Sequence, residues 1–232
     1  MSRYVKKEFI GLLEFLEKYE SNKCLLEPIV NTSLNRIHKI ALGVLAWKIE
    51  LERYSSINLM YLDEAVSDIV QTIPLFVQGF YKAAFCLLRS SIENFYKFFL
   101  SNIGGQDMSG VKFTDGIYEQ IKNLELVKSN EFLIRNFGLI KSTYSSLCLY
   151  VHSAESFCAF EEALINFPKY SDKEITDFIK YLDILIRSIN NVLCYTLNHI
   201  YYRMNHINFE LVTSLLSRDT ITIIRDLERA PT

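Results

Sequence analysis

Hydrophobic residues recur at helical spacing along most of the chain, and this pattern predicts an all-α protein. A second helix is expected to start at a cap formed by Asn31, Thr32 and Ser33 and to run to about Tyr54. A third is expected from about Tyr61, where Pro74 should kink or split it, because proline lacks a backbone donor and clashes with the preceding turn. The first helix is marked by one apolar face, formed by Phe9, Leu12, Leu13, Leu16 and Tyr19.

The most apolar segment is predicted to form a helix over about 75–102. A helix that is apolar nearly all round is typical of the centre of a bundle. Its aromatic residues are also expected to leave an exposed face that favours dimerisation. That face carries Phe95, Phe98 and Phe99, opposite Leu88 and Ile92.

The second half of the chain is predicted to begin with a loop over 104–116, which holds four of the eight glycines. The pattern then indicates helices over about 116–127 and 130–151 and leaves 153–170 unassigned. Ser171-Asp172-Lys173-Glu174 is a capping box, and the helix that it opens keeps one apolar stripe to about residue 205.

One domain accounts for all these elements. We expect a single all-α helical bundle over residues 1–232, with its core at about 60–205. The N-terminal helices (3–54) and short C-terminal helices (207–228) are expected to pack on that core. Each helical block by itself would expose a wide apolar face, so the central loop is not a domain linker.

The composition excludes several classes of protein. Half of the residues are hydrophobic, which excludes disorder, and 8 Gly and 4 Pro exclude a collagen-like chain. The formal net charge of −2 argues against a protein that coats DNA or RNA through a global basic field, although a local basic pocket stays open.

Cysteine usage and apolar run length predict the compartment. The five cysteines include no CxxC pair, which indicates free thiols in a reducing cytoplasm. The N-terminus lacks the apolar core of a signal peptide, and no apolar run is long enough to cross a bilayer. We therefore expect a cytoplasmic protein without a membrane partner.

Metal and nucleotide motifs are missing from the sequence. It contains no HExxH and no Glu-x-x-His pair, and its four histidines have no mutual ligand spacing. It also lacks a P-loop and a GxGxxG. We therefore predict neither a bound metal nor a cofactor.

The first candidate for chemistry is the segment Leu87-Leu88-Arg89-Ser90-Ser91-Ile92-Glu93-Asn94. Arg89 and Glu93 are four residues apart and share one helix face. One interpretation is a structural ion pair that holds this helix in register. The other is an arginine that Glu93 orients towards an anion.

The second candidate lies near the end of the helix predicted over 130–151. Tyr144, Cys148 and His152 share one face there. Histidine at a helix C-terminus often makes only a favourable contact with the helix dipole. If His152 meets Arg89 across the bundle, however, an imidazole that moves protons and a guanidinium that grips phosphate share one pocket.

These two segments carry a family resemblance. Leu-Arg-Ser-x-x-Glu on a hydrophobic helix, followed some distance later by Tyr-Ser-x-Leu-x-x-Tyr-Val-His, resembles HEPN-like helical-bundle proteins. The resemblance covers about residues 60–205. It is strongest to bacterial members found beside abortive-infection and other phage-defence genes. In the superfamily's usual pattern Arg and His are close in sequence, whereas Arg89 and His152 come from different helices, as in this divergent subfamily.

The resemblance implies a function in defence or in a toxin–antitoxin system, with metal-independent cleavage of RNA. By this resemblance, Arg89 would hold the scissile phosphate, Glu93 would orient Arg89, and His152 would be the general base or acid. Tyr144, Ser145 and Tyr150 are the expected substrate-binding residues. The resemblance also implies a homodimer, or a protein partner encoded nearby.

Two other functions stay open. The first is a non-catalytic interaction or regulatory subunit of a phage-defence complex, in which Arg89 and Glu93 form a locked, buried pair. The second is a small-ligand or nucleotide sensor that uses the aromatic interior of the bundle as a pocket.

Overall fold

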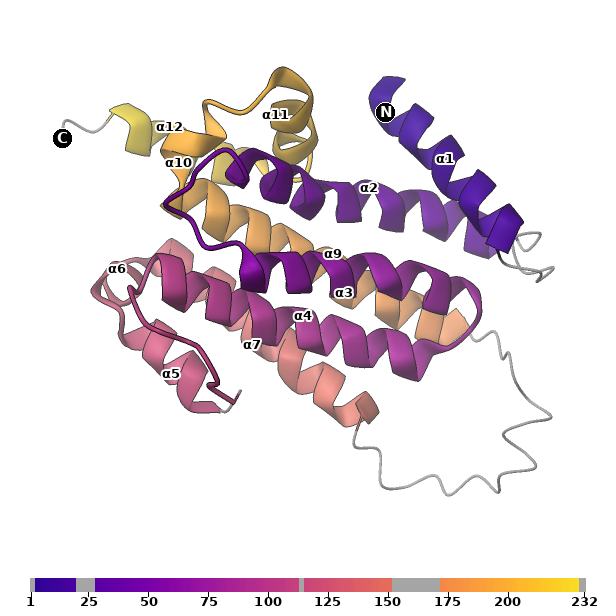
Figure 1. Ribbon diagram of the computed structural model, residues 1–232, viewed down its shortest axis with the longest axis horizontal. Coiled ribbons are helices and arrows are strands. Elements are labelled where there is room, and N and C mark those ends of the chain that lie inside the picture. Colours follow the sequence, from indigo (N-terminus) through magenta and orange to yellow (C-terminus); the bar gives the residue numbers. More distant parts are fainter. Residues whose placement is uncertain (1–2, 20–27, 113–114, 152–171, 230–232) are drawn as a thin grey trace.

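The computed structural model describes residues 3–19, 28–112, 115–151 and 172–229, and these residues form helices and connecting loops without a strand. Figure 1 shows the long helices packed side by side as a bundle. The predicted all-α helical bundle is confirmed. The long helices are α2 (Pro28–Leu51), α3 (Met60–Val77), α4 (Tyr81–Asn102), α7 (Glu131–Val151) and α9 (Asp172–Thr196).

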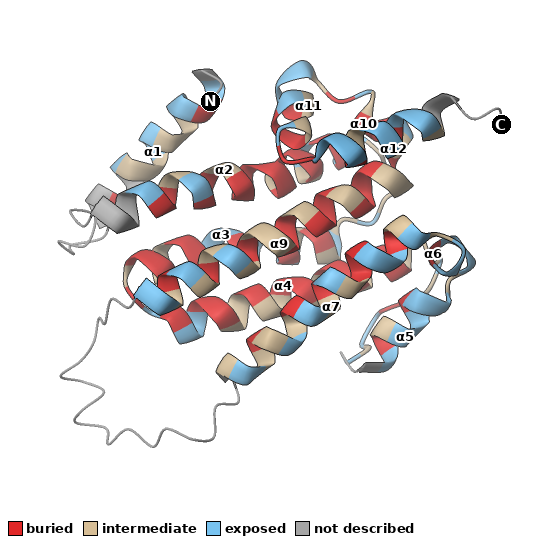
Figure 2. Cartoon of the chain, turned by 180° about the vertical axis from the view of Figure 1, so that it is seen from behind, coloured by how far each residue is buried: buried red, intermediate tan, exposed pale blue. Residues whose placement is uncertain are grey.

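Helix α4 is the centre of the bundle, since it contacts α3, α7 and α9. Its buried surface extends around most of the helix (Figure 2). Phe95, Phe98 and Phe99 are fully buried, so the expectation that they form an exposed face for dimerisation is wrong. The apolar surface of this helix is covered by neighbours within the same chain, including the edge-to-face ring of Phe137 on α7, 4.8 Å from Phe99.

Helix α4 begins at Tyr81 and not at about residue 75, and three other helix boundaries also differ from those predicted. Helix α2 begins at Pro28 and not after the Asn31–Ser33 cap, because proline suits the first turn of a helix, where its missing donor has no partner to lose. Helix α3 continues through Pro74 to Val77 and is not split there. Proline removes only its own backbone N–H donor, and Pro74 lies close to the end of the helix. Its carbonyl still accepts a hydrogen bond from the Gln78 N–H at 2.9 Å.

The third difference is at the end of the long helix opened by the capping box. Helix α9 ends at Thr196, well before residue 205, and a short helix, α10 (Asn198–Tyr201), follows it. The apolar stripe nevertheless continues, because Ile200 and Met204 are buried beyond the break. Ser171, the proposed cap residue, lies outside the described residues.

Helix α1 (Arg3–Tyr19) crosses α2. The segment predicted as one helix over about 116–127 forms two, α5 (Asp115–Asn123) and α6 (Glu125–Lys128), which precede α7. The loop predicted after α4 is confirmed over 103–112. Near its start is Gly105, whose φ of 64° is typical of the residue that follows a helix C-terminus. The C-terminal segment forms two short helices, α11 (His206–Thr213) and α12 (Arg218–Arg229).

A buried carboxylate fastens α11 to α2. Glu50 is 1% exposed, and its Oε1 accepts from the side-chain amides of Asn205 (2.5 Å) and Asn208 (2.6 Å). Its Oε2 pairs with Arg53 Nη1 at 2.9 Å. Because Asn205 also caps α11 by accepting from the Asn208 N–H, one carboxylate fixes both the position and the start of this helix.

Replacing this carboxylate should destabilise the fold. We expect Glu50→Ala to lower the free energy of unfolding by about 3 kcal/mol, because it leaves buried amide donors without an acceptor. Urea denaturation measures the change. Glu52→Ala, two residues away on the exposed surface, is the matched control and should stay within about 0.5 kcal/mol of wild type. Equal effects of the two variants would contradict this role of Glu50.

A buried histidine lies between α1 and α2. His38 is 7% exposed, and the ring of Phe9 on α1 is 5.4 Å from its ring. Its Nδ1 makes no hydrogen bond within the described part of the chain. Burial lowers the pKa of His38 below its usual 6.5, so the side chain is neutral at pH 7.

Protonation of His38 should therefore weaken the fold. The unfolded chain binds a proton at this residue at higher pH than the folded chain, so stability is kept above about pH 6.5 and lost as the pH falls through the folded pKa. We expect His38→Gln to flatten this part of the stability–pH profile, measured by urea denaturation. His199→Gln, at an exposed histidine, should retain the wild-type slope; identical profiles for all three proteins would refute the assignment.

Candidate functional site

The polar residues of the motif on α4 divide between two neighbouring helices. Arg89 and Glu93 face α7, where they meet Tyr144. Asn94, one residue further round the helix, faces α3 and donates to Asp68 Oδ2 at 3.1 Å. Consecutive positions on a helix point about 100° apart, so one short motif supplies polar contacts to both neighbours.

One carboxylate oxygen of Glu93 accepts hydrogen bonds from both Arg89 and Tyr144. We call these three residues the Arg89 cluster. Glu93 Oε1 accepts from Arg89 Nε at 3.1 Å and from the Tyr144 hydroxyl at 3.1 Å. The guanidinium carbon lies 5.4 Å from the centre of the Tyr144 ring, within range of a cation–π contact. About a quarter of the Arg89 and Glu93 side chains remains exposed, so the ion pair is in contact with solvent.

The electrostatics of the Arg89 cluster fix the protonation of Tyr144. Burial raises the pKa of Tyr144 to about 12, and the nearby charge of Glu93 adds to the effect, while Arg89 opposes it. Burial lowers the pKa of Arg89, but the hydrogen bond with Tyr144 and the charge of Glu93 outweigh it and raise that pKa overall. At neutral pH Tyr144 is therefore a hydrogen-bond donor and not a general base, beside a charged guanidinium.

Two other residues, Cys148 and His152, were predicted on the same helix face as Tyr144. Cys148 is half-buried and close enough to affect both Arg89 and Tyr144 electrostatically. His152, the proposed general base or acid, lies outside the described residues. The helix face that carries Tyr144 and Cys148 therefore belongs to the cluster as far as the structure describes it.

The two other expected substrate-binding residues are not part of the Arg89 cluster. Ser145 is exposed on α7. The Tyr150 hydroxyl donates to Asp177 Oδ2 on α9 at 2.5 Å, and its ring stacks on Phe85 at 4.2 Å. Burial, together with the Asp177 contact, raises the pKa of Tyr150, so this residue acts as a neutral link between α7 and α9.

Sequence reasoning missed Asp68, a buried carboxylate on α3. Burial raises the pKa of Asp68, against the opposing effect of hydrogen bonds from Ser90 and Asn94. The signal for it is present in the sequence, because Ser90 and Asn94 are four residues apart on a strongly apolar helix and need a polar partner. Which helix would supply that partner depends on the packing of α3 against α4.

Lys141, also missed, lies one helical turn before Tyr144. Its ammonium is 5.5 Å from the centre of the Tyr144 ring and 5.6 Å from the centre of the Tyr118 ring on α5. The helix face formed by Tyr144 and Cys148 thus extends towards α5 and includes a second cation. A spacing of three residues on α7 placed Lys141 on this face, but its partner Tyr118 comes from another helix.

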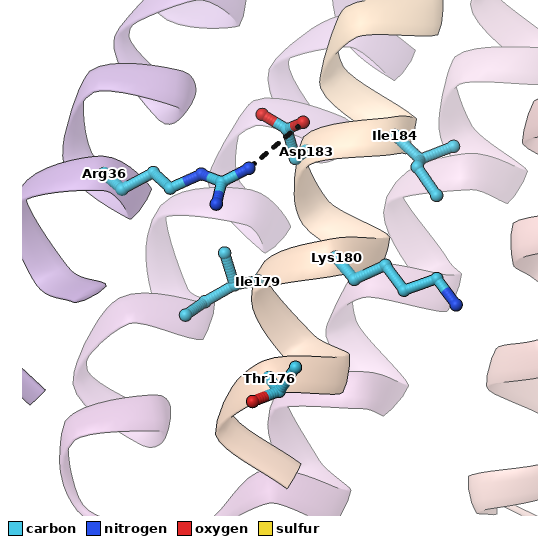
Figure 3. A pocket seen from close by; sticks show the side chains of 6 residues that line it. All are labelled: Arg36, Thr176, Ile179, Lys180, Asp183 and Ile184. Carbon is cyan, nitrogen blue, oxygen red and sulfur yellow. Dashed lines mark ion pairs between the residues drawn. The ribbon is translucent and has the colours of Figure 1, made fainter. Parts of the chain in front are cut away.

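Two hollows lie elsewhere on the surface. A hollow of about 350 Å³ between α2 and α9 is shown in Figure 3, with Arg36 paired to Asp183 at 3.5 Å. Asp183 also accepts from Arg187 Nε at 3.0 Å. A wider one, of about 790 Å³, lies where α7, α9 and α12 meet. Its charged residues are of both signs, Glu131, Arg135 and Asp226, so neither hollow presents a concentrated charge to a ligand.

The described residues contain no group of three or more His, Cys, Asp or Glu side chains placed to hold a metal ion. Within the same ranges, no helix combines the length and the apolarity needed to span a bilayer. Comparison of the chain with protein-family models, with curated proteins and with solved structures gives no match.

The shared oxygen of Glu93 should couple Tyr144 energetically to the ion pair. We expect a double-mutant cycle of Glu93→Gln and Tyr144→Phe to give an interaction energy of about 1 kcal/mol, because each variant removes part of one hydrogen-bonded unit. The free energies come from urea denaturation. The same cycle with Tyr150→Phe in place of Tyr144→Phe should give less than about 0.3 kcal/mol, because Tyr150 bonds to Asp177. A Glu93–Tyr144 coupling as small as this control would disprove the unit.

Proposed function

We propose that this protein is a HEPN-like endoribonuclease of a bacterial defence or toxin–antitoxin system that works without a metal ion. The observation that supports the proposal best is the Arg89 cluster: Glu93 and Tyr144 hold a guanidinium in a fixed, partly exposed position. A guanidinium fixed in this way suits a phosphodiester, because its fork of donors matches phosphate oxygens and loses little side-chain entropy on binding.

The proposed reaction is the one that the resemblance implies. The 2′-hydroxyl of RNA attacks the adjacent phosphorus, the bond to the 5′-oxygen of the next nucleotide breaks, and a 2′,3′-cyclic phosphate and a 5′-hydroxyl are formed. His152 transfers the proton between the attacking and leaving oxygens. Arg89 stabilises the extra negative charge on the phosphorane, and Glu93 orients Arg89. Tyr144, a neutral phenol, donates a hydrogen bond and holds Glu93 in place.

A homodimer, or a complex with a partner encoded nearby, belongs to the same proposal. The buried aromatic residues of α4 are not available for such an interface. The outer side of α7 is available for an interface. Leu139 and Leu149 are 40% and 75% exposed on this helix, which also carries Tyr144. Because both leucines are five positions from Tyr144, an interface there would lie on the side of α7 away from the Arg89 cluster.

A second function is supported by the same cluster. Arg89 and Glu93 form an ion pair, and Tyr144 bonds to the same carboxylate, so the charges are balanced within the protein. Such a pair also suits a non-catalytic interaction or regulatory subunit of a defence complex, in which it keeps α4 and α7 in register.

Cleavage of RNA by the purified protein in the presence of a chelator separates the two functions. We expect wild type to leave fragments with 2′,3′-cyclic phosphate ends. Arg89→Ala and His152→Ala should each reduce the rate at least about 100-fold, because each removes a group that acts on the reacting atoms.

The control for Arg89→Ala is Arg135→Ala, at an exposed arginine on α7, which should cleave at the wild-type rate. Thermal unfolding of each variant checks that the fold is intact. If folded wild type leaves the RNA uncut, the ribonuclease proposal fails and the interaction subunit is the better explanation. Equal rates for wild type and folded Arg89→Ala would likewise exclude Arg89 from the reaction.

A further inference from the structure

Helix α1 lies at the outside of the bundle, next to α2 (Figure 1), and its two halves are held differently. In the N-terminal half, over residues 3–10, Val5 is buried in a small cluster with Leu42 on α2 and Leu211 on α11, and this cluster is separate from the main core. Leu16, near the other end of α1, is fully buried in the main core. Opening the N-terminal half therefore removes no fully buried side chain from that core, and Leu16 keeps the helix attached.

His38 on α2 is the residue that this half of α1 covers. Its side chain is buried, and its ring lies 5.4 Å from the ring of Phe9. Its Nδ1 is enclosed and makes no hydrogen bond within the described part of the chain. Because an imidazolium carries a proton on both nitrogens, protonation would place an N–H donor at Nδ1 without an acceptor. Such a group costs free energy for as long as the ring stays buried.

No neighbouring charge stabilises an imidazolium at this position. Among the described residues, burial is the one cause that lowers the pKa of His38, so no carboxylate is close enough to oppose it. Charged and titratable residues do occur on the helices around His38: Lys6, Lys7 and Glu8 on α1, Arg36 and Lys39 on α2, Asp183 on α9, and His206 and Glu210 on α11.

We propose that protonation of His38 releases the N-terminal half of α1, so that this half is a cover over the outer face of α2 that opens at acidic pH. Lifting Phe9 gives the ring of His38 access to water, which hydrates the charge. Leu42 loses its contact with Val5 in the same step, so an apolar patch that is buried at pH 7 becomes exposed. This inference is independent of the proposed function.

Hydrogen exchange of backbone amides measures the opening. The amides of residues 7–11 bond within α1, and release exposes them, because a short helix is marginal in water by itself. For the wild type, we expect their protection factor, corrected for the pH dependence of chemical exchange, to fall about tenfold per pH unit below about pH 6.5 and to level off below the pKa of folded His38. At each pH it should also be lower than the protection factor of the α4 amides, which exchange only through global unfolding.

His38→Gln removes the titrating group and should make the protection of these amides independent of pH between about 6.5 and about 5. His38→Leu, which is apolar and also does not titrate, is the second variant if the first lowers the melting temperature, and one folded variant is sufficient. His199→Gln, at an exposed histidine on α10, is the matched control and should keep the wild-type pH dependence.

Three results would overturn the inference. Equal protection of α1 and α4 at every pH would mean that α1 opens only when the whole chain unfolds. A wild-type protection factor that stays constant from about pH 7.5 to about pH 5, or a decrease that persists in the folded His38 variant, would show that His38 does not control the opening. No RNA enters this experiment, so the ribonuclease proposal is tested separately.

Discussion

The burial of α4 on nearly all sides is the constraint on which the rest of the structure depends. Most of a helix in this position loses its contact with water, so its buried polar groups need a partner within the protein. Asp68 on α3 meets Asn94, and Tyr144 on α7 meets the Arg89–Glu93 pair. The same helix therefore organises the apolar core through its phenylalanines and specifies, through a few polar residues, which helices lie beside it.

The Arg89 cluster shows how such a structural requirement provides a chemical site. At this point on α4 the ion pair keeps about a quarter of its side-chain area exposed. The contacts that compensate for burying Arg89 also restrict its orientation, and an oriented, charged guanidinium is what phosphate recognition requires. Stability and the proposed anion binding would thus both depend on the shared oxygen of Glu93.

The ends of the chain follow the same logic on a smaller scale. Glu50 is buried because α11 covers it, and the amides of Asn205 and Asn208 replace the water that it loses. His38 is buried beneath α1 and, among the described residues, finds no hydrogen-bond partner for its Nδ1, so it remains neutral at pH 7. Burial lowers the pKa of His38, so a fall in pH favours the unfolded chain, which binds a proton at this residue more readily.

By itself, the sequence determined the helical class, most helix positions and the shared face of Arg89 and Glu93, because these depend on spacing within one segment. It did not determine that α3 continues through Pro74 or that α9 ends at Thr196, since local rules compete with tertiary packing at such points. Only the tertiary structure decided that Phe95, Phe98 and Phe99 face the core, and that Tyr144 joins the Arg89 cluster while Tyr150 binds Asp177. The partners Asp68 and Tyr118 come from other helices, and a contact between distant segments is set by how helices pack, which no spacing within one segment encodes.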